Sequence, residues 1–345
     1  MGLQFKELII KKEITIENLR GKILAVDTYN NLYQYLTTIR GPDGSVLTDS
    51  QGRVTSHLIG LFNRTTSLME AGIKLVFVFD GKPPAIKQKT WEKRAAVKQQ
   101  ASLRFQEAQE EGNVDEMRKM ASRTARLTKE MLEDAKNVIR ALGLPIVQAP
   151  SEGEAQTAYM VKQGKAYASV SQDYDNLIFG CPLLLRNLSI EGRRKKAGTL
   201  AYEKVHPEII SLKEVLSHLN LTLDQLIILA ILIGTDYNPG GIKGIGPKTA
   251  LKLVQEFKLN FDLLFEYVKW SQASPELSWQ EIFTTIRQVP VTDDYVLSWS
   301  KIDETKALQL LVQEHNFSEE RVKAKLEKIR EVQGKGIQQG LGNFL

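Results

Sequence analysis

Hydrophobic residues make up 42% and charged residues 25% of the 345 positions, an ordinary balance for a globular protein with a core of its own. The single cysteine, Cys181, excludes an internal disulfide, and the longest apolar run, residues 226–233, is too short to span a bilayer. No apolar signal core follows Met1, so a reducing cytoplasmic or nuclear location is expected. The net charge of +5 and the pI near 9.0 favour a polyanionic partner.

Three short apolar runs, each ending in an aspartate, predict buried parallel strands. They are residues 22–27, 74–80 and 166–173. Helical patterns alternate with them at residues 56–71, 128–142 and 154–163. This alternation predicts an α/β fold with a central, mostly parallel, twisted sheet flanked by helices.

Residues 84–129 are highly charged, and few of their positions could be buried. Residues 82–104 carry one anion, Glu92, and seven cations: Lys82, Lys87, Lys89, Lys93, Arg94, Lys98 and Arg104. A charge run is usually a solvated face, so this pattern alone assigns no function. It predicts an insertion that projects from the core, with a break at Gly112 between two helical halves.

From residue 211 the pattern becomes helical. Helices are predicted over residues 212–219 and 223–233, and another over 250–257 after a glycine-rich turn. The last fifteen residues, 331–345, contain four glycines and predict a flexible tail.

The strand-end aspartates carry the strongest chemical signal. In an open α/β sheet the carboxyl ends of the strands share one edge, so Asp27, Asp80 and Asp173 are expected to lie close together. Four further acids lie at strand or helix ends: Glu152, Glu154, Asp175 and Asp236. One such acid is often only a helix cap, but seven together are unfavourable unless a cation compensates their charge.

All-oxygen ligands favour Mg²⁺ or Mn²⁺ over zinc. The four histidines have no metal-ligand spacing, and no Cys-x-x-Cys motif is present. Two divalent ions roughly 4 Å apart can activate water and stabilise the leaving oxygen of a phosphodiester. The residues therefore predict metal-dependent phosphodiester hydrolysis.

Four segments resemble the flap endonucleases in order and spacing. They are residues 77–84 (FVFDGKPP), 149–156 (APSEGEAQ), 171–175 (SQDYD) and 234–248 (GTDYNPGGIKGIGPK). The resemblance covers essentially the whole chain and is closer to archaeal than to eukaryotic forms. It implies a PIN-like 5′ nuclease domain over residues 1–330, with a helical arch at 82–130 and a duplex-binding helix–hairpin–helix region at 211–260. It also assigns the seven acids to two Mg²⁺ ions, for which Mn²⁺ can substitute.

The resemblance assigns roles to further positions. Lys87 and Arg94 match arch cations that reach the scissile phosphate, and on one continuous helix their seven-residue spacing would place them on the same face. The positions that match DNA-contacting residues are Gly2, Tyr33, Arg40, Thr55 and Arg64. One position departs from the family, because Gln309 stands where a lysine of the 3′-flap pocket is common.

Two elements imply partners. The glycine-rich turn before the predicted helix offers backbone N–H groups to a phosphate, and it resembles a helix–hairpin–helix that grips duplex DNA and permits a K⁺ ion. Its residues are Lys243, Gly244, Gly246 and Lys248. The final residues QQGLGNFL fit helix-in-groove docking on a sliding clamp (PCNA). The docking residues are Gln338, Leu341, Phe344 and Leu345.

The resemblance implies a monomeric 5′ flap endonuclease with 5′-3′ exonuclease activity, acting in Okazaki fragment maturation and DNA repair. Its DNA substrates would be 5′-flap, double-flap and nicked duplexes, with no membrane partner. It would lie in the cytoplasm near the nucleoid of an archaeon, or in the nucleus of a eukaryote. The alternatives are a bubble nuclease, 5′ exonuclease or junction resolvase of the same superfamily, a non-catalytic clamp-tethered scaffold, and a small-molecule phosphatase. The phosphatase leaves the duplex-binding turn and the tail unexplained.

Overall fold

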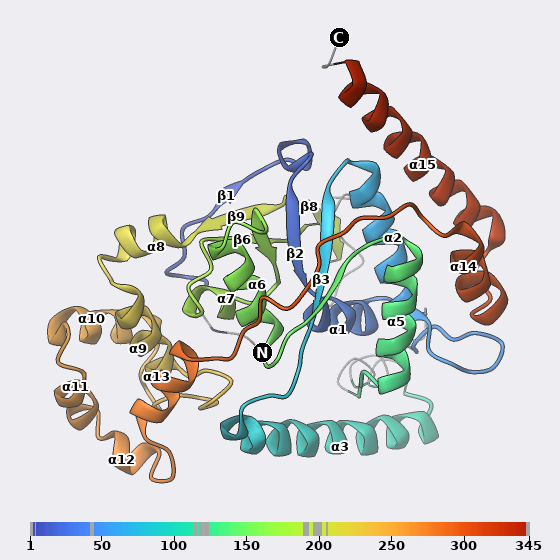
Figure 1. The fold of residues 1–345 in the computed structure, drawn as a ribbon. Coiled ribbons are helices and arrows are strands. Elements are labelled where there is room, and N and C mark those ends of the chain that lie inside the picture. Colours follow the sequence, from blue (N-terminus) through green and yellow to red (C-terminus); the bar gives the residue numbers. More distant parts are fainter. Residues whose placement is uncertain are drawn as a thin grey trace.

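The computed structural model describes residues 3, 5–41, 45–113, 116, 120, 124–188, 193–195, 202–204 and 206–342. Its centre is a mixed sheet in the order β1-β9-β6-β5-β2-β3-β4 (Figure 1). The strands are β1 (Lys12–Glu13), β2 (Ile23–Asp27), β3 (Lys74–Phe79), β4 (Ile146–Gln148), β5 (Ala168–Val170), β6 (Leu183–Arg186) and β9 (Glu208–Ser211). All pairings from β6 to β4 are parallel, while β9 pairs antiparallel with β6 and β1. The predicted α/β fold is confirmed.

Alternate residues of the central strands enter two separate cores, as the period of a strand requires. Ala25 of β2 and Val76 of β3 face one core, whereas Leu24 and Leu75 face the other. Because both faces are covered by helices, these strands are apolar on both sides.

The first face of the sheet is covered by α6 (Gly153–Lys162), which contacts β2, β3 and β5. The second face is covered by α1, α2 and α5. Their bounds are α1 (Thr28–Thr38), α2 (Ser56–Glu70) and α5 (Lys129–Ala141). The short α7 (Asp175–Ile178) links α6 to the helical region described next.

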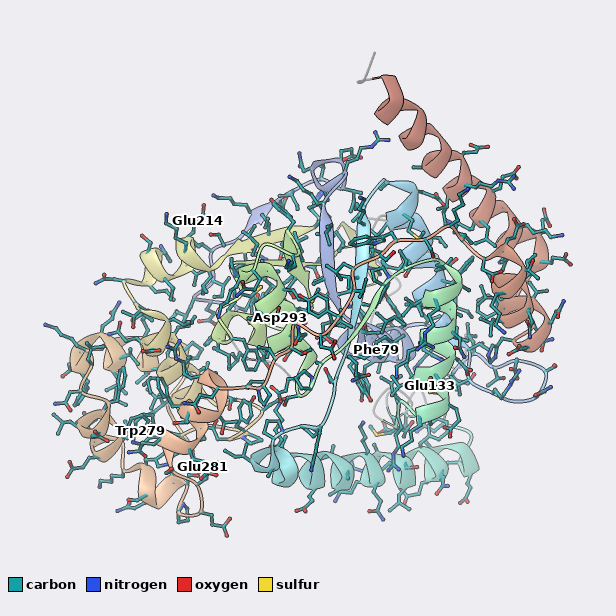
Figure 2. All side chains as sticks on the ribbon, in the orientation of Figure 1. Phe79, Glu133, Glu214, Trp279, Glu281 and Asp293 are labelled. Carbon is teal, nitrogen blue, oxygen red and sulfur yellow. The ribbon has the colours of Figure 1, made fainter. Side chains whose placement is uncertain are left out.

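A helical region packs beside the sheet and shares the first core. Its helices are α8 (Leu212–Leu219), α9 (Leu223–Ile233), α10 (Pro247–Phe257), α11 (Phe261–Tyr267), α12 (Trp270–Ala273) and α13 (Trp279–Arg287). Trp279, which is labelled in Figure 2, stacks on Phe265 with ring centroids 4.6 Å apart. In the part of the chain that is described, no single helix is long and apolar enough to cross a membrane, and only α8 and α9 together, bent by 78°, reach that length and composition.

An extended segment, residues 288–303, crosses from α13 to the second core (Figure 1). Gln156 of α6 exchanges two hydrogen bonds of 2.8 Å with the backbone of Thr292, and the Trp299 indole donates to the Leu75 carbonyl. The segment leads to α14 (Glu304–Leu308), a π-helical turn η3 (Gln309–Glu314) and α15 (Glu319–Gly342). Val322, Leu326 and Ile329 of α15 are buried in the second core.

The predicted insertion begins with the 3₁₀ turn η2 (Ala85–Lys87) and continues as α3 (Gln88–Glu110). Figure 1 shows α3 running past one edge of the sheet, apart from the helices that cover its faces. The helix ends just before Gly112, whose φ of +67° suits glycine, at the predicted break. Outside the main sheet, β7 (Arg193–Lys195) and β8 (Tyr202–Lys204) form an antiparallel pair, and η1 (Glu17–Leu19) precedes β2.

The third predicted strand and the C-terminal segment differ from their predictions. The third strand is shorter than predicted, because after Val170 the Ser171 hydroxyl accepts the Asp173 N–H and forms a local turn instead of extending the strand. The helical backbone of α15 also continues to Gly342, where a flexible tail was predicted from residue 331. Ile329 is the last residue of the helix in the described core, and the glutamines and lysine of the following segment favour helices.

Candidate active site

The predicted acids meet at one edge of the sheet, beyond the carboxyl ends of four adjacent parallel strands. Asp27 ends β2, and Asp80 follows β3 directly. Glu152 and Glu154 lie at the start of α6. They follow β4, a strand that was not predicted from the sequence. The remaining acids are Asp173 and Asp175, which follow β5, and Asp236, which follows α9.

Each strand-end aspartate accepts hydrogen bonds that fix its orientation. Asp27 caps α1, accepting from the Asn30 backbone N–H at 3.3 Å and from the Ser171 hydroxyl at 3.2 Å. Asp80 accepts from the backbone N–H of Gly153 at 2.6 Å, which ties β3 to the N-terminus of α6. The helix dipole at each of these sites also favours negative charge.

Glu152 is buried, and both of its carboxylate oxygens are engaged. Oε1 forms an ion pair with Lys87 Nζ, and Oε2 accepts a 2.7 Å hydrogen bond from the Tyr237 hydroxyl. Lys87 Nζ also lies 3.7 Å from Asp236 Oδ2 and 4.9 Å from the centre of the Tyr237 ring. The base of the insertion therefore reaches directly into the acidic site.

Asp173 was predicted to end the third strand, and the structure corrects this placement. Because β5 ends at Val170, Asp173 lies in the turn and Asp175 is the first residue of α7. Asp173 Oδ2 accepts a 2.6 Å hydrogen bond from the Asn30 amide. Asp175 Oδ1 accepts one of 2.8 Å from the backbone N–H of Leu3, so the N-terminal segment borders the site.

Crowding and burial disfavour the ionised form of several acids. Burial, followed by repulsion from Asp236, raises the pKa of Asp175 to about 7. Burial raises the pKa of Asp80 to about 6, and neighbouring Glu152 adds to this effect. The pKa values of Asp27 and Glu154 are also raised, first by burial and then by the charges of Asp80 and Asp175, respectively. The site therefore holds unfavourable negative charge.

This donor set fits a hard divalent cation, because it consists of carboxylate oxygens whose repulsion such a cation would relieve. In the part of the chain that is described, however, no group of three or more acidic, histidine or cysteine side chains has a geometry that could hold one ion. The reason is local, since most of these carboxylates are turned toward protein donors. These side chains would have to turn from their present donors to converge on a metal.

The insertion differs in one respect from the prediction. Lys87 belongs to the 3₁₀ turn η2 and not to α3, so it does not share a helical face with Arg94. Pro83 and Pro84 lack backbone donors, and the Lys87 N–H bonds to the Pro84 carbonyl at 3.0 Å before the α-helix begins. Arg94 lies on α3, and its side chain is outside the described part, as is that of Lys89.

Four of the predicted DNA contacts lie on or beside α1 and α2. Tyr33 lies on α1, where Lys98 Nζ of α3 is 5.0 Å from its ring centre. Arg40 follows α1 and donates to the Thr37 carbonyl, and buried Thr55 precedes α2. Arg64 on α2 donates to the Leu188 carbonyl. Gly2 is outside the described residues.

The glycine-rich turn lies at the N-terminus of α10, with Gly246 as its cap residue and Pro247 in its first turn. Lys243, Gly244 and Lys248 are exposed, and Gly244 has a φ of +87°. Helix α10 thus begins three residues earlier than predicted, because proline is well suited to the first helical position. Of the tail residues, Gln338 and Leu341 lie on the helical backbone without described side chains, while Phe344 and Leu345 lie outside the described part.

Three supporting residues were not identified from the sequence. Tyr237 binds Glu152, Asn30 binds Asp173, and the Thr90 hydroxyl on α3 donates to the Asp236 carbonyl at 2.7 Å. Tyr237 is next to Asp236 in the sequence, and Asn30 is three residues after Asp27. Closeness to a predicted acid was therefore the one sequence feature that could have identified these two residues. Nothing in the sequence pointed to Thr90.

Known proteins are similar to this chain over its whole length. The XPG N-terminal domain family matches residues 2–101, and the XPG I-region family matches residues 143–236. The flap endonuclease 1 of Pyrococcus abyssi (strain GE5 / Orsay) is 51% identical over 344 residues, covering 100% of this chain and 98% of that one. The chain belongs to the flap endonuclease family.

Solved structures agree with this family assignment. Flap endonuclease-1 from Methanococcus jannaschii matches with a TM-score of 0.72 at 41% identity, covering 95% of this chain and 98% of that one. The catalytic core of Rad2 in complex with a DNA substrate matches with a TM-score of 0.69, covering 95% and 100%. At 22% identity, the Rad2 match shows a shared fold alone.

Proposed function

We propose that this member of the flap endonuclease family hydrolyses a phosphodiester bond of DNA where a 5′ single-stranded flap meets duplex. The observation that carries the proposal is the meeting of seven acids beyond four adjacent parallel strands, beside the base of a cationic insertion. A non-catalytic scaffold would not need this concentration of buried charge, which disfavours the folded state.

The seven acids would hold two Mg²⁺ ions, with Mn²⁺ as a substitute. When bound, the ions would neutralise the acids, activate a water molecule and stabilise the leaving oxygen. The chain's own residues orient this site: Asn30 and Ser171 hold Asp27, and the backbone of Gly153 holds Asp80. Lys87 is placed to contact the phosphate once it leaves its carboxylate partners.

DNA would be held on both sides of this site. The exposed turn before α10 offers backbone N–H groups and two lysines to duplex phosphates, independently of base sequence. A K⁺ ion at this turn is part of the proposal. Tyr33 and the α1–α2 region would hold the junction, and Gln309, which hydrogen-bonds Glu314, would bind a 3′ flap less strongly than a lysine. The tail, residues 338–345, would dock on a sliding clamp.

Cleavage of three labelled DNAs separates this proposal from its alternatives. A double flap, a bubble and a four-way junction of matched sequence are incubated with Mg²⁺, and the products are mapped. Preferred cleavage of the flap at its junction supports the proposal. Preferred cleavage of the bubble or the four-way junction would instead favour another nuclease of the superfamily.

A further inference from the structure

Lys87 is an almost buried cation inside the acidic site. Its side chain is only 12% exposed, and its ammonium group is paired with Glu152 and lies 3.7 Å from Asp236. The aromatic face of Tyr237 is 4.9 Å away, which adds a cation–π contact. Two carboxylates, those of Glu152 and Asp236, surround the ammonium and favour its charged form.

These contacts occupy ligand positions that a metal would need. Glu152 has no free oxygen, because Lys87 holds Oε1 and the Tyr237 hydroxyl holds Oε2. The ammonium therefore partly neutralises Glu152 and Asp236. It also lies where a metal bound to Oε1 of Glu152 would lie. Competition between a resident cation and an incoming one follows directly from this geometry.

The position of Lys87 in the chain gives the competition a mechanical consequence. Lys87 ends the turn that begins the insertion, and three residues later the buried hydroxyl of Thr90 anchors α3 to the Asp236 carbonyl. This anchor does not involve the Lys87 side chain. The ammonium can thus leave the carboxylates while the base of the insertion stays at the edge of the site.

From these contacts we infer that Lys87 is the resident counter-ion of the substrate-free site, and that a divalent cation binding at Glu152 and Asp236 displaces its ammonium toward the substrate phosphate. Metal binding and the release of Lys87 are then one coupled event. Because coupling is reciprocal, removing the lysine must strengthen metal binding. This inference rests on the metal-binding role proposed above.

The test measures metal affinity without DNA and without cleavage. Mn²⁺ is titrated calorimetrically into the wild-type protein, Lys87→Met, and the control Lys82→Met at one pH. Lys82 is a nearby exposed cation of the same charge, so its variant reports the general effect of losing one positive charge. Lys87→Met is expected to bind Mn²⁺ roughly 5–150-fold more tightly than wild type, the usual range of coupling between two sites, and Lys82→Met much less so.

Equal or weaker Mn²⁺ affinity in Lys87→Met than in Lys82→Met would overturn the displacement of Lys87. Failure of every protein to bind Mn²⁺ would overturn the metal site of the proposed function as well. Amine labelling of the wild type, read by mass spectrometry, does not depend on the variant folding. Ca²⁺ or Mn²⁺ is expected to increase labelling of Lys87 at least about five-fold while leaving Lys82 unchanged, and unchanged labelling of Lys87 would contradict the inference.

Discussion

Asp175→Asn is expected to stabilise the metal-free protein while destroying its activity. The substitution removes one negative charge from the crowded site and keeps an oxygen that can accept the Leu3 N–H. Burial raises the pKa of Asp175 to about 7. Its ionised form is therefore unfavourable in the folded state when no metal is bound.

The size and pH dependence of this effect follow from linkage. The ordinary pKa of aspartate is about 3.9, and each tenfold change in proton affinity corresponds to about 1.4 kcal/mol, so a pKa near 7 gives an upper bound on the order of 4 kcal/mol. Because Asp175 also repels Asp236, part of this energy belongs to the neighbour. The penalty is absent below about pH 4, grows as the pH rises toward 7, and is complete above it.

The assay is equilibrium unfolding in guanidinium with EDTA, at about pH 8 and about pH 5. At the higher pH the free energy of unfolding of Asp175→Asn should exceed that of the wild type by about 1–4 kcal/mol. This difference should shrink at the lower pH. Asp294→Asn, which removes an exposed carboxylate, is the matched control and should show neither effect. Saturating Mg²⁺ should stabilise the wild type more than Asp175→Asn. Equal stability of the two proteins at the higher pH in EDTA would refute the reasoning.

Three further predictions concern other parts of the chain. Arg94→Ala should lower the single-turnover cleavage rate at saturating enzyme about 10²-fold. Arg104→Ala on the same helix should change only the affinity for DNA. Equal saturated rates for both variants and the wild type would show that the cations of α3 only attract DNA. Phe344→Ala with Leu345→Ala should abolish calorimetric binding to the cognate sliding clamp, at about 2 kcal/mol or more per anchor, and leave clamp-free cleavage unchanged. Burial alone would raise the pKa of Asp49, but two backbone N–H groups and a histidine lower it to about 2. Ionised Asp49 should therefore stabilise the folded state above about pH 4, and this stabilisation should be lost between about pH 4 and 2. The difference in unfolding midpoint between wild type and Asp49→Asn should narrow over that range.

Much of the fold could be predicted because hydrophobic periodicity and capping residues coincide in this chain. The boundaries of α8 and α9 agree with the sequence prediction, since Ser211 and Thr222 cap them. The boundary of α5 was also close, with Thr128 as its cap. Residues 146–148, by contrast, are too few to show strand periodicity and become a strand only by pairing with β3.

The acids could be predicted for a similar reason, since strand-end carboxylates in an α/β fold converge whatever the details of the loops. Their partners could not be predicted. The pairing of Lys87 with Glu152 joins residues 65 positions apart, and that of Thr90 with Asp236 joins residues 146 apart. Contacts over such distances depend on how the insertion folds back onto the sheet, and no local pattern in the sequence records it.

The most direct test of the central claim is cleavage of a labelled double-flap DNA by the wild-type protein and by Asp173→Ala, each with Mg²⁺ and with EDTA. Asp173 is held by the Asn30 amide and is not part of the exposed turn before α10 that is proposed to grip duplex. The wild type should cut at the junction only with Mg²⁺, and the variant should bind the DNA but leave it uncut. Cleavage in EDTA, or near-wild-type cleavage by Asp173→Ala, would contradict a metal-dependent reaction at these carboxylates.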